Sequence, residues 1–448
     1  MNGPRELPAV CELSSDLAHR FAEGLANGVE RRRVMSHLLQ GCEPCREAMR
    51  GRFHLIDDHR EDPFSMSRIL ANVANFERRL NAERAKAAEQ WEGFTRHPPQ
   101  RQWTILKNSA RFNTWPFCEK LLQAGWDALY DDPHRALEWN RMALLIADRI
   151  PAGAYGRRSE FDFRGRAWDR IANSLRATSD LAGAETALVT AERLLEEGSG
   201  EPLGEAEHLY FKASLRRAQR RFQEALTAIR KSRRIYRTIQ DPHLEGRSLL
   251  CHAAIHDISG EPLKACELAR QAVAQIDPQR DPRLALAARH NVIWYLMSAG
   301  LADEARLELE ELRPLYFENG DRMNLLRLKW MEGRIFRLRG DLAGAESRMR
   351  VAQAGFVEAE IPYEAAMVAL DIAVLLAENG RTHEIKSLAS ELVTVFRRLG
   401  VAREACAALM VFEGAAKAEI VTLTLLSKLG DYLERLRAQP DLRFEPEG

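Results

Sequence analysis

The stretches "GEPLKACELA" (260–269), "GLADEARLEL" (300–309) and "GDLAGAESRM" (340–349) begin 40 residues apart and share one pattern. Each starts with glycine and carries an alanine five residues later. A fourth copy, "GRTHEIKSLA" (380–389), has isoleucine in place of that alanine. Such a fixed period indicates that one structural unit is repeated along the chain.

A second marker keeps the same period of 40, because "DPHLEGR" begins at Asp241, "DPRLALA" at Asp281 and "DRMNLLR" at Asp321. The runs between the two markers are apolar-periodic and long enough for helices, so each unit is predicted to be a helix pair. The glycine ends the first helix in a left-handed conformation. Since a lone helical hairpin cannot cover its own apolar face, we expect the pairs to stack into an all-α solenoid.

Small residues also recur twelve positions before the alanine, at Ala172, Ala213, Ala253, Gly333 and Ala373. A small residue, then glycine, then alanine resembles the tetratricopeptide repeat, over residues 125–420 and in six or seven units. A unit of 40 residues instead of the usual ~34 implies longer helices, as in regulatory versions of this repeat in bacterial signalling proteins. The resemblance implies a protein-binding array, although such arrays bind many unrelated partners.

The length of 448 residues predicts several domains or an extended array. Lys plus Arg equals Asp plus Glu at 65 each, which argues against general affinity for nucleic acid or anionic membrane. No secretory signal and no apolar run of membrane-spanning length is visible, so we expect a cytoplasmic protein. We divide the chain into an N-terminal domain (1–60), a helical adaptor (61–124) and the solenoid with a C-terminal capping helix (125–440).

The stretch "HLLQGCEPC" places His37, Cys42 and Cys45 within nine residues. Zinc prefers four tetrahedral ligands drawn from thiolate and imidazole, and a C-x2-C spacing lets one turn present two thiolates. The fourth ligand is Cys11 or His19. A structural Zn2+ would stabilise a segment too small to form a good core. The alternative is a reversible dithiol formed by the two neighbouring cysteines.

This arrangement resembles the zinc-binding anti-sigma factor domain over residues 1–60. In that family, helices around the metal wrap a sigma factor and block its access to RNA polymerase. The resemblance implies that the zinc ligands are Cys11, His37, Cys42 and Cys45. The spacing differs from the family pattern, since this chain has H-x4-C-x2-C where H-x3-C-x2-C is usual.

Motifs for catalysis are not visible in the sequence. No P-loop, no G-x-G-x-x-G after a strand, no His-Glu-x-x-His helix and no nucleophile elbow is present. We therefore expect a protein that is not an enzyme. Direct binding of nucleic acid is not expected either, because no convincing recognition helix can be identified.

A partner-binding groove can be predicted from the repeat template, in which the first helix of each unit lines the concave face. Two tryptophans beside three arginines on that face would suit a peptide with acidic and apolar side chains. The alternative is that the arginines pair with glutamates of a neighbouring helix and the tryptophans pack. The predicted groove residues are His290, Asn291, Trp294, Arg327, Trp330, Arg334 and Arg337.

Two functions follow from these features. The first is a cytosolic regulator whose zinc domain binds a sigma factor or a similar operon-encoded protein, while the array senses a peptide or protein partner. The second is an interaction scaffold in a bacterial stress or defence operon, with zinc in a purely structural role.

Overall fold

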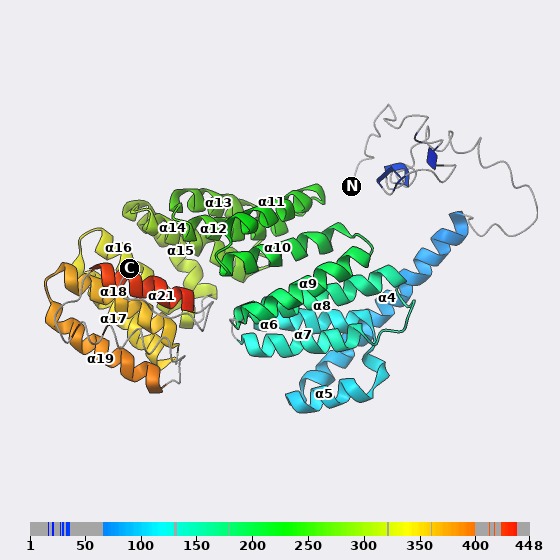
Figure 1. Ribbon diagram of the computed structural model, residues 1–448, viewed down its shortest axis with the longest axis horizontal. Helices are drawn as coiled ribbons and strands as arrows, with labels where there is room; N and C mark the ends of the chain where they lie inside the picture. Colours follow the sequence, from blue (N-terminus) through cyan, green and yellow to red (C-terminus); the bar gives the residue numbers. More distant parts are fainter. Residues whose placement is uncertain are drawn as a thin grey trace, which may run out of the picture. The chain divides into compact units, whose positions relative to one another are not determined.

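The computed structural model describes residues 66–436 except 130–131, 179, 320–321, 360, 399–411, 413–415 and 417–422, together with single residues between 17 and 35. In this part of the chain every regular element is a helix (Figure 1). None of the described helices has the length and apolar character needed to cross a membrane. The helices are α4 (Met66–Thr95), α5 (Pro99–Asn108), the 3-10 helix η1 (Ala110–Phe112), α6 (Trp115–Ala128), α7 (Pro133–Ala147), α8 (Arg157–Ala177), α9 (Leu181–Glu197), α10 (Pro202–Ala218), α11 (Phe222–Thr238), α12 (Pro242–Ile258), α13 (Pro262–Gln275), α14 (Pro282–Ser298), α15 (Ala302–Asn319), α16 (Arg322–Leu338), α17 (Leu342–Glu358), α18 (Pro362–Glu378), α19 (Thr382–Arg398) and α21 (Leu423–Leu436).

Residue contacts divide the chain into two compact units, residues 1–79 and residues 80–448. In the first unit, Asn27 begins a short helical stretch. Its side-chain oxygen accepts hydrogen bonds at 3.0 Å from the backbone N–H groups of Val29 and Glu30. The Glu30 carboxylate accepts one at 2.9 Å from the N–H of Asn27, which completes a reciprocal capping box.

The second unit is an array of helix pairs. From α10 onward the first helices begin at residues 202, 242, 282, 322 and 362, and the second helices at 222, 262, 302, 342 and 382. The two helices of a pair pack side by side, and each second helix packs on the first helix of the next pair (Figure 1). Successive first helices also contact one another. The predicted all-α array of repeated helix pairs is therefore confirmed.

Glycine ends the first helices of successive units, as predicted. At Gly260 the backbone N–H bonds to the carbonyl of Asp257 at 2.9 Å, and the next N–H, of Glu261, bonds to the carbonyl of His256 at 2.8 Å. These two bonds define a Schellman ending, which requires a positive φ. Arg220 occupies the same register with φ of 57° and is thus a strained exception. The glycines with φ between 69° and 85° in this register are Gly260, Gly300, Gly340 and Gly380.

Aspartate starts first helices at the second marker. The carboxylates of Asp241 and Asp281 accept hydrogen bonds from the N–H groups of Leu244 and Leu284, each at 2.9 Å. A proline follows each aspartate at the first helical position, where a missing N–H costs nothing. The "DP" dipeptides therefore mark where these helices begin.

The core uses small residues where paired helices cross. Gly333 of α16 lies so close to α17 that a Cβ atom there would be 2.6 Å from Cγ of Met349. Only a residue without a side chain fits this crossing. The recurring alanines are fully buried at Ala225, Ala265, Ala305 and Ala345. Large aromatic side chains at the ends of second helices fill the space between units and are at most 1% exposed at Tyr236, Tyr316 and Phe356.

An aromatic cluster covers the start of the array. Phe94 of α4 packs edge-on against Phe117 of α6 with ring centroids 5.3 Å apart. Trp91 of α4 lies 5.5 Å from Trp139 of α7. The C-terminal part of α4 thus packs on the first helix pair. The predicted boundaries at residues 60, 124 and 440 stay predictions.

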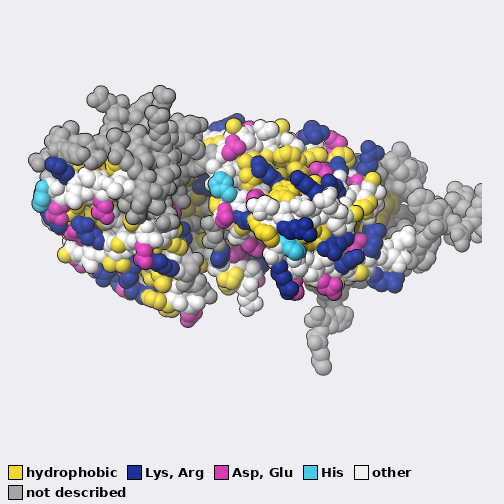
Figure 2. Space-filling view, turned by 90° about the horizontal axis from the view of Figure 1, so that it is seen from below, with side chains coloured by type: hydrophobic (Ala, Val, Ile, Leu, Met, Phe, Trp, Pro, Cys, Tyr) yellow, Lys and Arg dark blue, Asp and Glu magenta, His cyan; other side chains and the backbone are white. Residues whose placement is uncertain are grey.

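Charges of both signs are mixed on the surface. Figure 2 shows Lys and Arg side chains interspersed with Asp and Glu side chains over one face of the described residues. This pattern agrees with the equal totals of 65 cationic and 65 anionic residues. Selective binding must therefore come from local arrangements of side chains rather than from the net charge.

Candidate functional site

The predicted groove residues lie on two first helices. Trp294 of α14 and Trp330 of α16 meet edge to face with ring centroids 5.6 Å apart. The guanidinium of Arg334 lies 4.4 Å from the Trp294 ring, within range for a cation–π contact. The structure brings these three side chains together. The seven predicted residues are His290, Asn291 and Trp294 on α14, and Arg327, Trp330, Arg334 and Arg337 on α16.

Carboxylates of α18 pair with this face. Trp330 Nε1 donates a hydrogen bond to Asp371 at 2.6 Å, and Arg334 lies 3.7 Å from the same carboxylate. Arg337 makes a forked contact to Glu378 at 2.7 and 2.9 Å. Arg334 and Arg337 therefore already have acceptors within the chain. The role of this face in partner binding stays a prediction.

The other members of the predicted set are also engaged. His290 Nδ1 lies 2.6 Å from the hydroxyl of Tyr316. Burial, with the nearby charge of Arg327, lowers the pKa of His290 to about 4, so its imidazole is neutral at physiological pH. Arg327 itself donates to the side chain of Asn324 at 3.3 Å. Asn291 is half-buried.

A second cluster joins four first helices nearer the start of the array. Arg170 donates to Glu207 at 2.6 Å, and its guanidinium lies 4.6 Å from the Trp126 ring. The guanidinium of Arg247 lies 5.1 Å from the same Trp126 ring and 4.7 Å from Tyr210. Two arginines thus share one indole ring. We call this set the arginine–aromatic cluster, and its members are Trp126, Arg170, Glu207, Tyr210, Phe211 and Arg247.

The arginine–aromatic cluster holds two cations around one carboxylate. Burial alone would raise the pKa of Glu207, but the charges of Arg170 and Arg247, with a smaller effect of Arg166, outweigh burial and lower it. Burial lowers the pKa of Arg170, and the like charge of Arg247 adds to this effect. Among the described residues, Arg170 Nη1 and Arg247 Nε are buried without a hydrogen-bond acceptor. These N–H groups can therefore donate hydrogen bonds to a further anionic or carbonyl oxygen.

Several residues of this cluster lie at the same positions of the 40-residue repeat as the predicted groove residues. Arg247 precedes Arg327 by two periods of 40, and Glu207 precedes Arg247 by one. Tyr210 likewise precedes Trp330 by three periods. Extending the predicted groove positions backward along the array would have identified these residues.

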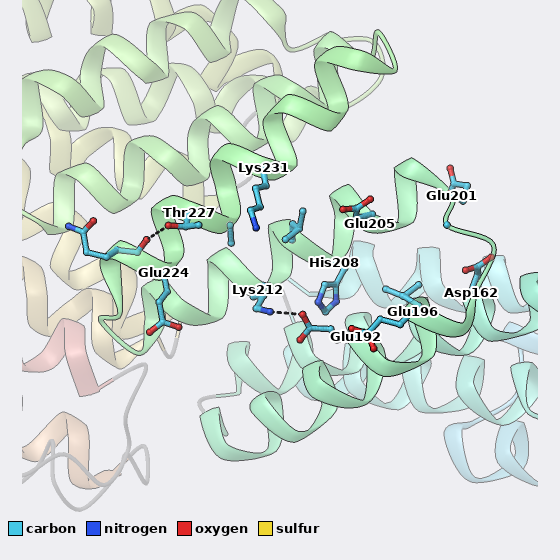
Figure 3. A pocket seen from close by; sticks show the side chains of 15 residues that line it. Asp162, Glu192, Glu196, Glu201, Glu205, His208, Lys212, Glu224, Thr227 and Lys231 are labelled. Atoms are coloured by element: carbon cyan, nitrogen blue, oxygen red, sulfur yellow. Dashed lines mark hydrogen bonds and ion pairs between the residues drawn. The ribbon is translucent and has the colours of Figure 1, made fainter. Parts of the chain in front are cut away.

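A pocket of about 670 Å³ lies between the second helices α9 and α11, with α10 beneath it (Figure 3). His208 of α10 is 5% exposed, and its Nδ1 lies 2.8 Å from the carboxylate of Asp169 behind it. Burial alone would lower the pKa of His208, but Asp169 outweighs this and raises it. The pocket is lined by Asp162, Glu192, Leu195, Glu196, Gly200, Glu201, Glu205, His208, Leu209, Lys212, Gln223, Glu224, Thr227, Ala228 and Lys231.

The predicted zinc ligands Cys11, His37, Cys42 and Cys45 lie outside the described residues, as does His19. Within the part of the chain that the structure describes, no group of three His, Cys, Asp or Glu side chains is placed to hold a metal ion. The buried free thiols in this part are Cys118, Cys251 and Cys266.

Comparison with known proteins relates the chain to solved helical repeats. No family model and no curated protein sequence matches it. The crystal structure of a Rap protein complexed with Competence and Sporulation Factor is similar, with a TM-score of 0.52 and 13% identity, over 71% of this chain and 87% of that one. The apo form of RapI (12% identity, 68% and 98% coverage, TM-score 0.42) and aspartyl phosphate phosphatase F from Bacillus subtilis (11%, 93% and 96%, 0.45) also match. The chain has a tetratricopeptide-type helical repeat fold. At this low identity the likeness extends to the fold alone.

Proposed function

We propose that this protein is a protein-interaction regulator whose helical array binds a peptide or a segment of a partner protein at the arginine–aromatic cluster. The observation that carries the proposal is the pair of guanidiniums of the half-buried Arg170 and the buried Arg247, which share Glu207 as their one neighbouring carboxylate among the described residues. A carboxylate of the partner would supply the missing acceptor through charge-assisted hydrogen bonds. The aromatic rings beside the arginines would bury the apolar part of the same segment.

The location of the cluster supports this proposal. Its side chains come from α6, α8, α10 and α12, which are all first helices. A bound segment can therefore contact several repeat units at once, which an isolated helix pair does not allow. The similar Rap protein, of the same fold, was crystallised with Competence and Sporulation Factor. This complex is a precedent for ligand binding by an array of this kind.

For the N-terminal domain we propose a zinc site formed by Cys11, His37, Cys42 and Cys45, through which the surrounding helices bind a sigma factor or a similar protein. Support comes from the resemblance to the anti-sigma factor domain. The helix that begins at Asn27 with a capping box precedes His37, as a helical hairpin around the metal requires. Zinc would then hold the corner of that hairpin.

The test is quantitative affinity purification of the tagged full-length chain from its native cell. Arg247→Lys keeps the charge but removes the planar fork that stacks on Tyr210, so recovery of an array-bound partner should fall by ~10-fold. Arg221→Lys is the matched control, because Arg221 is exposed and forms an ion pair with its neighbour Glu224 on the same helix, away from the cluster. Circular dichroism checks that both variants fold. Equal recovery with both variants would contradict binding at the arginine–aromatic cluster.

The same purification separates the two parts of the proposal. Cys42→Ser should release a partner held by the zinc domain and leave an array-bound partner in place. A sigma factor among the proteins lost with Cys42→Ser would support the anti-sigma role. A single partner that persists in Cys42→Ser but is lost in Arg247→Lys would favour the scaffold function, with zinc in a structural role only.

A further inference from the structure

One face of α10 forms the floor of the pocket between α9 and α11. Glu205, His208 and Lys212 line the pocket at positions i, i+3 and i+7, so their side chains lie along one side of this helix. Lys231 of α11 points toward this face, and Glu196 belongs to the α9 wall (Figure 3). Proton donors and carboxylates therefore lie about one helical turn apart in this pocket.

Most charges of the pocket are already paired within the chain. The pairs are Lys212 with Glu192, Glu201 with Arg166, and Glu224 with Arg216 and Arg221. Asp162 accepts hydrogen bonds from the backbone N–H of Ser199. The exposed side chains of Glu196, Glu205 and Lys231 have no ion-pair partner among the described residues. The charges left for a ligand are therefore one ammonium group and two carboxylates.

His208 is the observation that marks the pocket as a ligand site. Its side chain is 7% exposed, and Nδ1 donates at 2.8 Å to Asp169, which lies behind the pocket and does not line it. Burial alone would lower the pKa of His208, but the charge of Asp169 outweighs burial and raises it. Glu192 of α9 adds to this rise and Lys212 opposes it. The ring is therefore held in its protonated form, in which Nε2 is an N–H donor.

This second N–H donor of His208 has no acceptor. Nε2 is buried and makes no hydrogen bond within the part of the chain that the structure describes. It lies on the side of the ring away from Asp169, and the ring lines the pocket. A buried donor without an acceptor is costly, so binding of a ligand oxygen at this point is favoured.

The chemistry of the ligand follows from these groups. A carboxylate would accept hydrogen bonds from both His208 Nε2 and the ammonium group of Lys231. A ligand with only negative charge would be repelled by Glu196 and Glu205, whereas a ligand with only positive charge would leave His208 without an acceptor. A zwitterion meets both conditions, since its ammonium group can bind Glu205 one turn away from His208.

Apolar side chains lie between the charged groups. Leu195 of α9, Leu209 of α10 and Ala228 of α11 line the pocket from its three helices. They provide a surface on which an aliphatic side chain can be buried. The volume of about 670 Å³ is in the range of small-molecule sites.

We propose that the pocket between α9 and α11 binds an aliphatic α-amino acid as a zwitterion. Its carboxylate accepts hydrogen bonds from His208 Nε2 and Lys231, and its ammonium group donates to Glu205. Its side chain packs on Leu195 and Leu209. A short peptide with free termini has the same chemistry, but we favour the free amino acid because donor and acceptor are only one turn apart. The site is separate from the arginine–aromatic cluster and does not depend on the partner proposed there.

Isothermal titration calorimetry of the full-length chain with L-leucine tests the proposal. We expect saturable binding of one leucine per chain. Lys231→Gln and Glu205→Gln should each weaken this binding by ~3–5-fold, because each removes one exposed ion pair with the ligand. The matched control is Glu197→Gln, an exposed carboxylate of α9 that does not line the pocket and should leave the affinity unchanged.

Ligand analogues test the two charged groups of the zwitterion separately. Leucinamide lacks the carboxylate, and N-acetylleucine lacks the ammonium group. Each should bind at least ~10-fold more weakly than leucine, because one set of charge-assisted hydrogen bonds is lost. Equal affinity for leucine and leucinamide would contradict the carboxylate contact, and equal affinity for leucine and N-acetylleucine would contradict the ammonium contact.

Nuclear magnetic resonance tests the contact with His208 itself. The Cε1–H resonance of His208, identified by its loss in His208→Gln, should shift when leucine is added. Saturable binding without this shift would overturn the assignment of the carboxylate to His208. No saturable binding of leucine or leucyl-leucine up to ~10 mM would overturn the proposal as a whole. Tighter binding of leucyl-leucine at the same residues would support the zwitterion site and identify a peptide as its ligand.

Discussion

Replacing Gly300 by alanine isolates the backbone strain at the end of one repeat helix. Gly300 has φ of 76°, and a Cβ atom added there would meet nothing within 4 Å. The substitution therefore creates no clash and removes no contact. A residue with a Cβ in the left-handed conformation costs about 1–2 kcal/mol, and alanine regains part of this by restricting the unfolded chain. We expect Gly300→Ala to lower the free energy of unfolding by about 1 kcal/mol.

Urea denaturation followed by far-UV circular dichroism measures this change. The matched control is Gly93→Ala in α4, where φ is not positive and the space around a Cβ atom is again open. There alanine should stabilise the helix by ~0.5–1 kcal/mol, because glycine is the poorer helix former. The same chemical change thus has opposite signs at the two positions. A Gly300→Ala variant as stable as the wild type would refute the left-handed helix ending.

Three further predictions concern buried charge and metal. Glu207→Gln leaves Arg170 and Arg247 without their shared carboxylate and should reduce the free energy of unfolding by about 3 kcal/mol. The control is Glu205→Gln, two residues away and exposed, which should change that free energy by less than ~0.5 kcal/mol. Urea titrations measure both values. Burial, together with the charge of nearby arginines, lowers the pKa of His252 to about 3. Because the unfolded chain takes up this proton below pH ~6.5, stability should fall as the pH drops from about 6.5 toward 3, with about 2 kcal/mol lost by pH 5. Thermal unfolding at pH 7.5 and pH 5 should show a smaller pH effect for His252→Gln. Metal analysis of protein purified without added zinc should find about one zinc per chain. Cys42→Ser should lower that ratio. A ratio near zero for the wild-type protein under reducing conditions would exclude the structural zinc.

The helix pairs could be predicted because their limits are set by local chemistry. Glycine in the left-handed ending and aspartate before proline each mark a helix boundary without reference to the rest of the fold. Arg220 is an exception to the rule that glycine marks the end of a first helix. It adopts the same left-handed conformation without glycine, so the end of α10 cannot be located from a glycine in the sequence.

The sites were less predictable because they depend on which helices meet. The arginines of α16 were identified from their spacing, but the sequence does not show that Asp371 and Glu378 of α18 pair with them. The pocket around His208 depends on Asp169, a residue of the preceding first helix, 39 positions earlier. Such pairs become visible only when the register of the array is combined with the three-dimensional packing of its helices.

The central claim is that a partner segment binds the face of the first helices at the arginine–aromatic cluster. In-cell photo-crosslinking tests this most directly, with a photoreactive phenylalanine placed at Gln123, which is exposed and lies one turn before Trp126 on α6. The control position is Val351, which is 54% exposed on the second helix α17. We expect a crosslinked partner from Gln123, its loss when Arg247→Lys is added, and none from Val351. Crosslinks of equal yield from both positions, or none from Gln123 while the partner still co-purifies, would contradict the claim.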